Sequence, residues 1–290
     1  MATETRRRIR VFRMAEWTDF SPPVALTIAG SDNSAGAGAQ ADLKTFSAAG
    51  VYGLTAITCV VAEVPGRLAA IQPVDFAIVR HQIELLSNNY PIRATKTGLL
   101  HSAGVIALVA DIYGTRRSTK NRPRLVVDPV MVASSGDLLL EPDAVDAYRE
   151  RLFPLATLVT PNLDEVVALL GRPVTNLAAM HEAGLELADT YGVPFLVKGG
   201  HLGGEVAVDL LVFPGGRIEE YSAPFTHGVS THGTGCAYSA AITAHLARGS
   251  ELVDAVREAK AYVSAAIRHH FRWQHRDAPE IDALNHFPPA

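Results

Sequence analysis

The sequence predicts an α/β protein with three layers, in which helices cover both faces of a central, mostly parallel sheet. From Val24 onwards, short apolar segments alternate with longer amphipathic segments, and glycine-rich turns separate them. This alternation is typical of strand–helix–strand units, whose strands run parallel. Val206–Phe213 and Arg217–Tyr221 differ, because only Pro214-Gly215-Gly216 separates them. They predict a β-hairpin at an edge of the sheet.

The remaining elements follow from the same pattern, in order along the chain. Each expected strand is a short apolar run that ends at a glycine, a proline or a polar residue, and each expected helix repeats apolar residues every three or four positions. The expected strands are Val24–Ala29, Leu54–Val61, Ala94–Thr97, Arg124–Val127, Leu158–Thr160 and Phe195–Lys198. The expected helices are Ala39–Ala48, Phe76–Ser87, Ala103–Tyr113, Asp164–Leu170, Ala178–Tyr191, Thr234–Ala247 and Leu252–Phe271. No repeat or break in composition divides residues 24–290, so we expect a single domain there.

The composition excludes several classes of protein. Of the 290 residues, 48% are hydrophobic and 19% are charged, and no apolar run is long enough to cross a membrane. The formal net charge of −4 argues against a nucleic-acid partner. The two cysteines, Cys59 and Cys236, form neither a disulfide framework nor a metal-binding spacing. We therefore expect a cytoplasmic protein with reduced thiols.

Residues 1–23 differ from the rest of the chain. Five arginines crowd between positions 6 and 13 with no apolar signal core behind them, which excludes a secretory signal. Three acidic residues argue against an organellar transit peptide: Glu4, Glu16 and Asp19. We expect a disordered tail, or a protein whose natural start is Met14.

The most informative segment is His232-Gly233-Thr234-Gly235-Cys236, just before an expected helix. Its glycines allow a tight turn and a close approach to a ligand. The helix start adds unpaired N–H groups and the positive end of its dipole, and together they form an anion site. Cys236 places a nucleophile or a base in the first turn. The segment therefore predicts a site for a phosphoryl group beside a reactive side chain.

Four other loops follow expected strands, where ligands bind in parallel sheets. The loop 30–38 offers glycines, hydroxyls and the carboxylate of Asp32. Asp128 and Glu165 are candidate Mg²⁺ partners, with structural roles as a loop-stabilising residue and a helix cap as the alternatives. Lys198, directly after an apolar strand, is placed to neutralise phosphate charge, although many lysines are solvated surface residues.

Together, these loops resemble the ribokinase-like kinases, and within them the hydroxymethylpyrimidine/phosphomethylpyrimidine kinases of thiamine biosynthesis. The resemblance runs from about Val24 to about His286. It is carried by the segments Ala25–Asp32, Gln40–Phe46, Gly50–Gly53, Val127–Met131, Thr160–Asn162, Val197–His201 and Thr231–Cys236. It implies a ribokinase-like three-layer fold, ATP and Mg²⁺ as cofactors, an aminopyrimidine substrate and a homodimer.

The resemblance also implies residue roles. Gly233, Thr234 and Gly235 would supply amides to the transferring phosphoryl group, and Cys236 would be the catalytic base, its pKa lowered by the helix N-terminus. Lys198 and Gly200 would contact the ATP phosphates. Asn162 would bind Mg²⁺ and phosphate, and Asp128 and Glu165 would hold Mg²⁺ through water. The pyrimidine pocket would be lined by Gly30, Asp32, Glu63 and Val130.

Two positions depart from the family pattern. Glu63 stands where the family usually has a glutamine that pairs with the aminopyrimidine, and Ser134 stands where a lysine is frequent. Three alternatives therefore stay open. The chain could be a pyridoxal/pyridoxine kinase, although pyridoxal lacks the exocyclic amine that Glu63 would bind. It could be a sugar or nucleoside kinase, although these usually carry Asp at position 236. It could also be a non-catalytic nucleotide- or vitamer-binding protein on a kinase scaffold.

Overall fold

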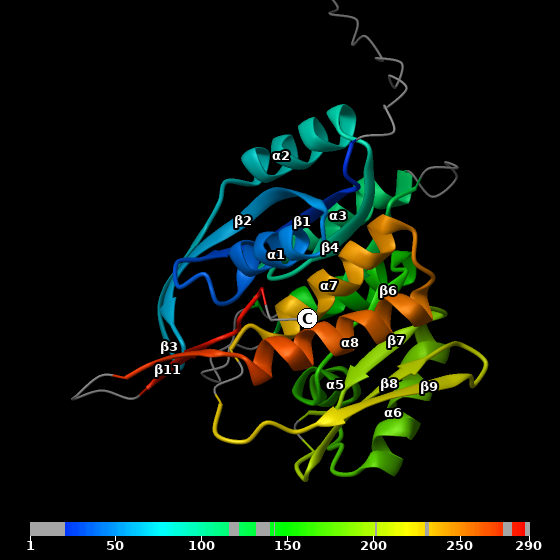
Figure 1. Cartoon of the computed structure of the whole chain (residues 1–290). Helices are drawn as coiled ribbons and strands as arrows, with labels where there is room; N and C mark the ends of the chain where they lie inside the picture. Colours follow the sequence, from blue (N-terminus) through cyan, green and yellow to red (C-terminus); the bar gives the residue numbers. More distant parts are fainter. Residues whose placement is uncertain are drawn as a thin grey trace, which may run out of the picture.

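A nine-stranded sheet between two layers of helices organises the computed structural model, which describes residues 21–115, 122–131, 140–141, 143–200, 202–229, 232–274 and 280–287 (Figure 1). The strands are ordered β3-β2-β1-β4-β5-β6-β7-β8-β9. Their bounds are β1 Val24–Asp32, β2 Tyr52–Val64, β3 Arg67–Pro73, β4 Ile92–Thr97, β5 Arg124–Val127, β6 Leu158–Val159, β7 Phe195–Lys198, β8 Val206–Val212 and β9 Ile218–Pro224. The predicted α/β fold with a mostly parallel sheet is confirmed.

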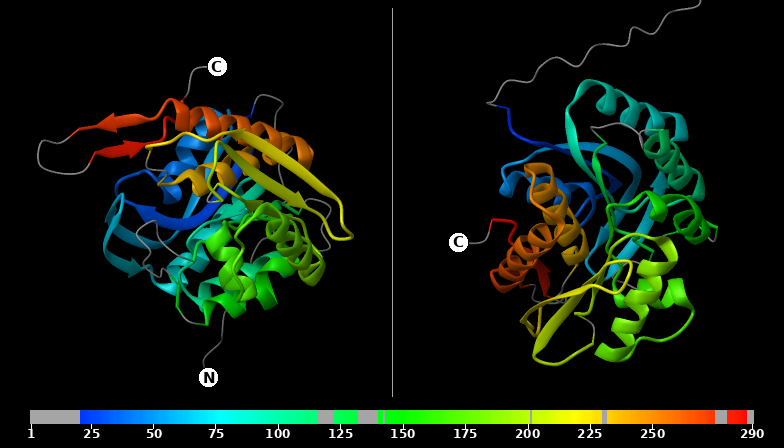
Figure 2. Two further views of the ribbon diagram at one scale, coloured as in Figure 1. Left: turned by 90° about the horizontal axis from the view of Figure 1, so that it is seen from below. Right: turned by 90° about the vertical axis from the view of Figure 1, so that its right-hand side faces the viewer.

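The helices fall into two layers, which the alternation of side chains along the strands reflects (Figure 2). On β7, Leu196 packs with one layer, whereas its neighbours Phe195 and Val197 pack with the other. The first layer is formed by α1 Gly38–Ala48, α7 Thr234–Arg248 and α8 Leu252–Arg268. The second layer includes α2 Phe76–Asn89, α3 Ala103–Thr115, α4 Ala144–Ala147, the short turns η1 Tyr148–Leu152 and η2 Phe153–Leu155, α5 Leu163–Leu170 and α6 Leu177–Tyr191. The central strands β1, β4, β5, β6 and β7 are buried on both faces, as parallel strands usually are.

Antiparallel strands close both edges of the sheet. The pairs from β2 through β1, β4, β5 and β6 to β7 are parallel, whereas β8 and β9 form the predicted hairpin at one edge. At the other edge β3 pairs antiparallel with β2, and the sequence prediction missed this strand. Arg67–Pro73 is mostly exposed, so it lacks the apolar run by which the other strands were found.

The end of the chain also differs from the prediction. The last long helix stops at Arg268 rather than at Phe271. Phe271–Trp273 instead forms β10, which pairs antiparallel with β11, Ile281–Ala283, in a separate small hairpin. The prediction is too long because the aromatic side chain of Phe271 continues the apolar pattern of the helix in the sequence. None of the helices in the described ranges is long and apolar enough to span a membrane. Residues 1–20 of the Arg-rich tail lie outside the described residues.

The second layer of helices depends on an aromatic cluster around Phe153, which is fully buried. Its ring stacks on Tyr148, with centroids 5.6 Å apart, and meets the rings of Tyr191 and Phe195 edge-on at 5.2 and 5.8 Å. We predict that Phe153→Ala lowers the free energy of unfolding by about 3–5 kcal/mol, because it leaves a cavity between four elements. Urea unfolding followed by circular dichroism measures this loss.

Phe76→Ala is the matched control, because the Phe76 ring is 45% exposed at the start of α2. It should cost less than about 1 kcal/mol. Equal losses in the two variants would contradict the assignment of Phe153 to the core.

Candidate active site

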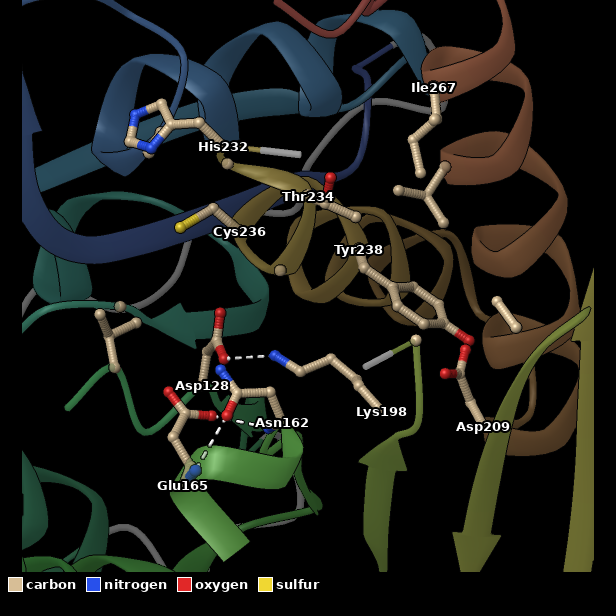
Figure 3. Close-up of a pocket in the computed structure, with 18 of the residues that line it drawn as sticks. Asp128, Asn162, Glu165, Lys198, Asp209, His232, Thr234, Cys236, Tyr238 and Ile267 are labelled. Atoms are coloured by element: carbon tan, nitrogen blue, oxygen red, sulfur yellow. Dashed lines mark hydrogen bonds and ion pairs between the residues drawn. The ribbon is translucent and has the colours of Figure 1, made fainter. Parts of the chain in front are cut away.

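The carboxyl ends of the parallel strands open into a cavity of about 580 Å³ that reaches from β2 to α8. Figure 3 shows side chains from several strand ends and from the start of α7 pointing into it. Every site residue that the sequence predicted lines this cavity. These residues are Gly30, Asp32, Glu63, Asp128, Val130, Asn162, Glu165, Lys198, Gly200, Gly233, Thr234, Gly235 and Cys236. His201 and Ser134, which the sequence also singled out, lie outside the described residues.

The start of α7 has the geometry of an anion site. Gly233 precedes the helix with a φ of +79°, and the first intrahelical bond runs from Ala237 N to Gly233 O. The amides of the residues between them therefore point beyond the helix end. The Oγ1 atom of Thr234 is buried and has no hydrogen-bond partner in the described part of the chain. A buried hydroxyl without a partner is costly, and a bound phosphate oxygen would satisfy it.

Cys236 lies in the first turn of α7, half-buried and with a free thiol, as the sequence predicted. Its electrostatic environment differs from the prediction. Burial raises the pKa of the thiol to about 11, although Lys96 and the backbone N–H of Gly38 lower it in part. The expected lowering of this pKa by the helix N-terminus was therefore wrong, because desolvation of the thiolate outweighs the favourable charges.

Across the cavity, Asp128 is buried at the end of β5 and receives three hydrogen bonds. Lys198 Nζ lies 3.1 Å from Oδ1, Thr160 Oγ1 lies 3.3 Å from the same oxygen, and Ser239 Oγ donates to Oδ2 at 2.9 Å. Burial alone would raise the pKa of Asp128, but the charges of Lys198 and Lys96 and the hydrogen bonds from Lys198 and Ser239 hold it below its ordinary value. Asp128 is therefore a fixed negative charge beside a fixed positive one (Figure 3).

Asn162 and Glu165 form a capping box at the start of α5. The Asn162 side chain accepts from Glu165 N at 2.9 Å, and Glu165 Oε2 accepts from Asn162 N at 2.7 Å. The structural alternative for these residues is thus confirmed, and both also line the cavity. Burial raises the pKa of Glu165 to about 7, with Lys198 acting in the opposite direction. Carboxylate oxygens from Asp128 and Glu165 are the hard donors that suit a hydrated Mg²⁺.

A third group of ionisable residues lies at the opposite end, where Asp32, Glu63 and His232 bring their polar atoms within 4.8 Å of one another. Asp32 is already used by its own loop, because its carboxylate accepts from Ser34 N, Ser34 Oγ and Ala37 N at 2.7–2.8 Å. Burial would raise the pKa of Asp32, but these bonds and the one from His232 lower it to about 2.

Glu63 is a member of this group whose pKa is shifted in the opposite direction to that of Asp32. Burial and the neighbouring charge of Asp32 raise the pKa of Glu63. Since the Asp32 oxygens are occupied by hydrogen bonds, the group is better suited to share a proton than to coordinate a metal ion.

The sequence analysis missed the far end of the cavity, which β8, β9 and α8 form. Apolar side chains line it together with a buried ion pair between Lys260 Nζ and Asp209 Oδ2, which are 2.7 Å apart. A signal in the sequence was Asp209, a charged residue inside the apolar segment Val206–Val212, whereas Lys260 lies among several charged residues of α8. The apolar residues at this end are Ala207, Ala223, Pro224, Phe225, Val263 and Ile267.

Comparisons with known proteins show similarity in sequence and in fold. Residues 32–280 match the family model for phosphomethylpyrimidine kinase. A hydroxymethylpyrimidine/phosphomethylpyrimidine kinase from Rhizobium meliloti is 46% identical over 245 residues, which cover 84% of this chain and 90% of the relative. Two solved structures are similar in fold. The ADP complex of Bacillus subtilis pyridoxal kinase has a TM-score of 0.81 and 37% identity, covering 92% and 98% of the two chains. Phosphomethylpyrimidine kinase from Clostridium difficile has a TM-score of 0.71 and 39% identity, covering 84% and 99%.

The anion site depends on the absence of a side chain at Gly233. A Cβ there would overlap the carbonyl oxygen of Gly36, so the turn before α7 touches the loop after β1. We predict that Gly233→Ala separates these loops and weakens nucleotide binding at least roughly tenfold, in addition to a backbone strain of about 1–2 kcal/mol. Isothermal titration with Mg-ADP measures the change in affinity.

Gly228→Ala is the matched control, because Gly228 also has a positive φ, +70°, but has no atom within 4 Å of the added Cβ. It should show the strain alone and bind nucleotide normally. A similar loss of affinity in both variants would mean that the loop contact does not shape the site.

Proposed function

Because the chain belongs to the phosphomethylpyrimidine kinase family, we propose that it phosphorylates 4-amino-5-hydroxymethyl-2-methylpyrimidine with ATP and then phosphorylates the monophosphate to the diphosphate, in thiamine biosynthesis. One observation carries the proposal: the anion site with Cys236 at the start of α7 faces Asp128, Glu165 and Lys198 across a single cavity. Phosphoryl transfer needs little beyond positioning and neutralisation of charge, and this cavity offers both.

The phosphate chain of ATP would lie between α7 and β7. The amides of Gly233, Thr234 and Gly235 would bind the transferring group, and the ammonium of Lys198 lies beside them, 3.1 Å from where a Cβ of Gly235 would be. Asp128 and Glu165 would hold Mg²⁺ through water, with Asn162 beside them. When bound, Mg²⁺ neutralises charge on the phosphate oxygens.

The two ends of the cavity would receive different parts of the substrates. The apolar end between β9 and α8, which Gly200 adjoins, suits the flat base of a nucleotide. The polar end, lined by Gly30, Asp32, Glu63 and Val130, would receive the pyrimidine. Glu63 can accept from an exocyclic amine, and in its protonated form it can also donate to a ring nitrogen.

The first transfer requires a base, because an alcohol is a poor nucleophile. The thiolate of Cys236 would take the proton of the substrate hydroxyl as its oxygen bonds to the γ-phosphorus and ADP leaves. The second transfer starts from a phosphate that is already ionised, so it needs no such base. One site can therefore serve both steps.

Pyridoxal is the second candidate substrate, and the similarity to solved pyridoxal kinases favours testing it. ADP release with Mg-ATP should be measured separately with hydroxymethylpyrimidine, its monophosphate and pyridoxal. Turnover of the first two is the expected result. Turnover of pyridoxal alone would replace the proposal by vitamin B6 salvage, and binding of ATP without any ADP release would indicate a non-catalytic binding protein.

Cys236→Ala separates the two transfers. We predict that it slows the phosphorylation of hydroxymethylpyrimidine by roughly a hundredfold or more, the usual contribution of a general base, and slows that of the monophosphate much less. Steady-state assays with each substrate measure the two losses. Cys59→Ala, which removes the buried thiol outside the cavity lining, should leave both rates near those of the unmodified protein. Equal losses of both steps in Cys236→Ala would exclude its role as the base.

Glu63→Gln should retain activity on the aminopyrimidine but change its pH dependence. The raised pKa of Glu63 keeps the neutral acid present above the ordinary range of a glutamate, so KM should rise as the pH passes through this raised value. An amide does not titrate, so the KM of Glu63→Gln should stay constant over the same pH range. Complete loss of activity in Glu63→Gln would show that the carboxyl group is itself required.

A further inference from the structure

A fully buried ion pair lies beneath the anion site and has no part in the proposed reaction so far. Lys96 on β4 places Nζ 2.8 Å and 2.9 Å from the two carboxylate oxygens of Asp42 on α1. Thr27 on β1 donates to Asp42 Oδ2 at 2.6 Å. All three residues have no exposed surface. The pair and its hydrogen bond therefore join three elements inside the protein.

Such a pair is weak evidence of a purely stabilising role. The cost of removing two charges from water is often as large as their attraction, and an apolar pair of similar volume is often equally stable. The role of this buried pair therefore depends on which nearby groups its charges affect.

The ammonium of Lys96 lies directly under the cavity floor. Gly98, two residues further along the chain, lines the cavity, and a Cβ on it would be 3.2 Å from Lys96 Nζ. The positive charge of Lys96 therefore lies close to the cavity wall at Gly98. The loop after β1 and the start of α1, which carries Asp42, lie on the same side, where Gly38 N–H donates to the Cys236 thiol.

Four charged groups act on Cys236 from the elements packed around it: Lys96 on β4, Asp42 on α1, Asp128 after β5 and Lys198 at the end of β7. Burial raises the pKa of the thiol, and among these groups Lys96 opposes this rise most strongly. Asp42 and Asp128 act in the other direction. Burial would lower the pKa of Lys96, but the attractions of Asp42, Cys236 and Asp128 together with the hydrogen bond to Asp42 raise it, so the ammonium stays charged.

We propose that Lys96 is a positioning residue for the reaction: its buried ammonium, held under Gly98 by Asp42 and Thr27, stabilises the thiolate of Cys236 without touching either substrate. This inference rests on the proposed role of Cys236 as the base. It assigns a function in catalysis to β4, a strand whose last three residues, Thr95, Lys96 and Thr97, are polar and fully buried. Without the charge of Lys96, burial would raise the pKa of the thiol further.

Alkylation of Cys236 by iodoacetamide tests the inference without any substrate, because only the thiolate reacts. The rate is followed over a range of pH by mass spectrometry of the peptide that contains Cys236, in the intact, folded protein. Lys96→Gln removes the charge but keeps a donor for Asp42. We expect the midpoint of the pH profile to move up, so that alkylation at about pH 8 slows roughly three- to tenfold.

Lys260→Gln is the matched control. Lys260 is also paired with a buried aspartate, Asp209, but at the far end of the cavity, where β8 and α8 meet. Its profile should coincide with that of the unmodified protein. An unchanged midpoint in folded Lys96→Gln, or the same upward move in both variants, would overturn the inference.

A second variant provides the test if Lys96→Gln does not fold. The double variant Lys96→Met with Asp42→Asn leaves no unpaired buried charge, and its midpoint should also move up because the effect of Lys96 exceeds that of Asp42. If neither variant folds, the pair is an element of structure and the inference is withdrawn. ADP release by the unmodified protein is measured alongside. Its absence would refute the proposed function, whereas an unchanged alkylation profile with normal ADP release would refute the role of Lys96 alone.

Discussion

The buried carboxylate of Asp128 is the constraint on which the geometry of the cavity depends. It follows β5 and accepts hydrogen bonds from Thr160 after β6, Lys198 on β7 and Ser239 on α7. These contacts fix the distance between the helix that carries Cys236 and the strand that carries Lys198. A buried carboxylate is tolerated only when such partners satisfy it. The same network therefore holds the fold together at this point and sets the separation of the phosphate-binding groups.

Local charges, rather than net charge, make the cavity suitable for anions. The chain carries a formal net charge of −4, so the electrostatic field of its net charge repels a nucleoside triphosphate. The cavity counters this with the amides at the start of α7, with Lys198 and with the ammonium of Lys96 below Gly98. Each positive group lies on or under a regular element, which holds it in place before a ligand arrives. Little reorganisation is then needed for binding.

The sequence predicted the loops of the site far better than it predicted their environment. Asp128, Lys198 and Cys236 could be found because each follows an apolar strand or a glycine turn, and parallel strands bring such positions to one edge. The strand β3 could not, since its exposed edge position imposes no apolar pattern.

The environment of Cys236 was predicted wrongly for a different reason. The helix N-terminus is visible in the sequence, but the burial that raises the pKa of the thiol arises from packing between distant segments. Lys96 and Asp42 are 54 positions apart, and only the folded sheet places them together beneath the site. Interactions of this range are inaccessible to arguments from local spacing.

The edges of the sheet decide where the two substrates can lie. Both edges turn antiparallel, and each extends past the ends of the parallel strands to form a wall of the cavity: β2 with β3 on the side of Glu63, and β8 with β9 on the side of Asp209. The first wall holds the carboxyl group of Glu63, whose pKa is raised, whereas the second is mainly apolar apart from the Asp209–Lys260 ion pair. In the proposed reaction, a nucleotide base and a small polar ring would therefore have different preferred ends, and the start of α7, which would bind the transferring phosphoryl group, lies between them.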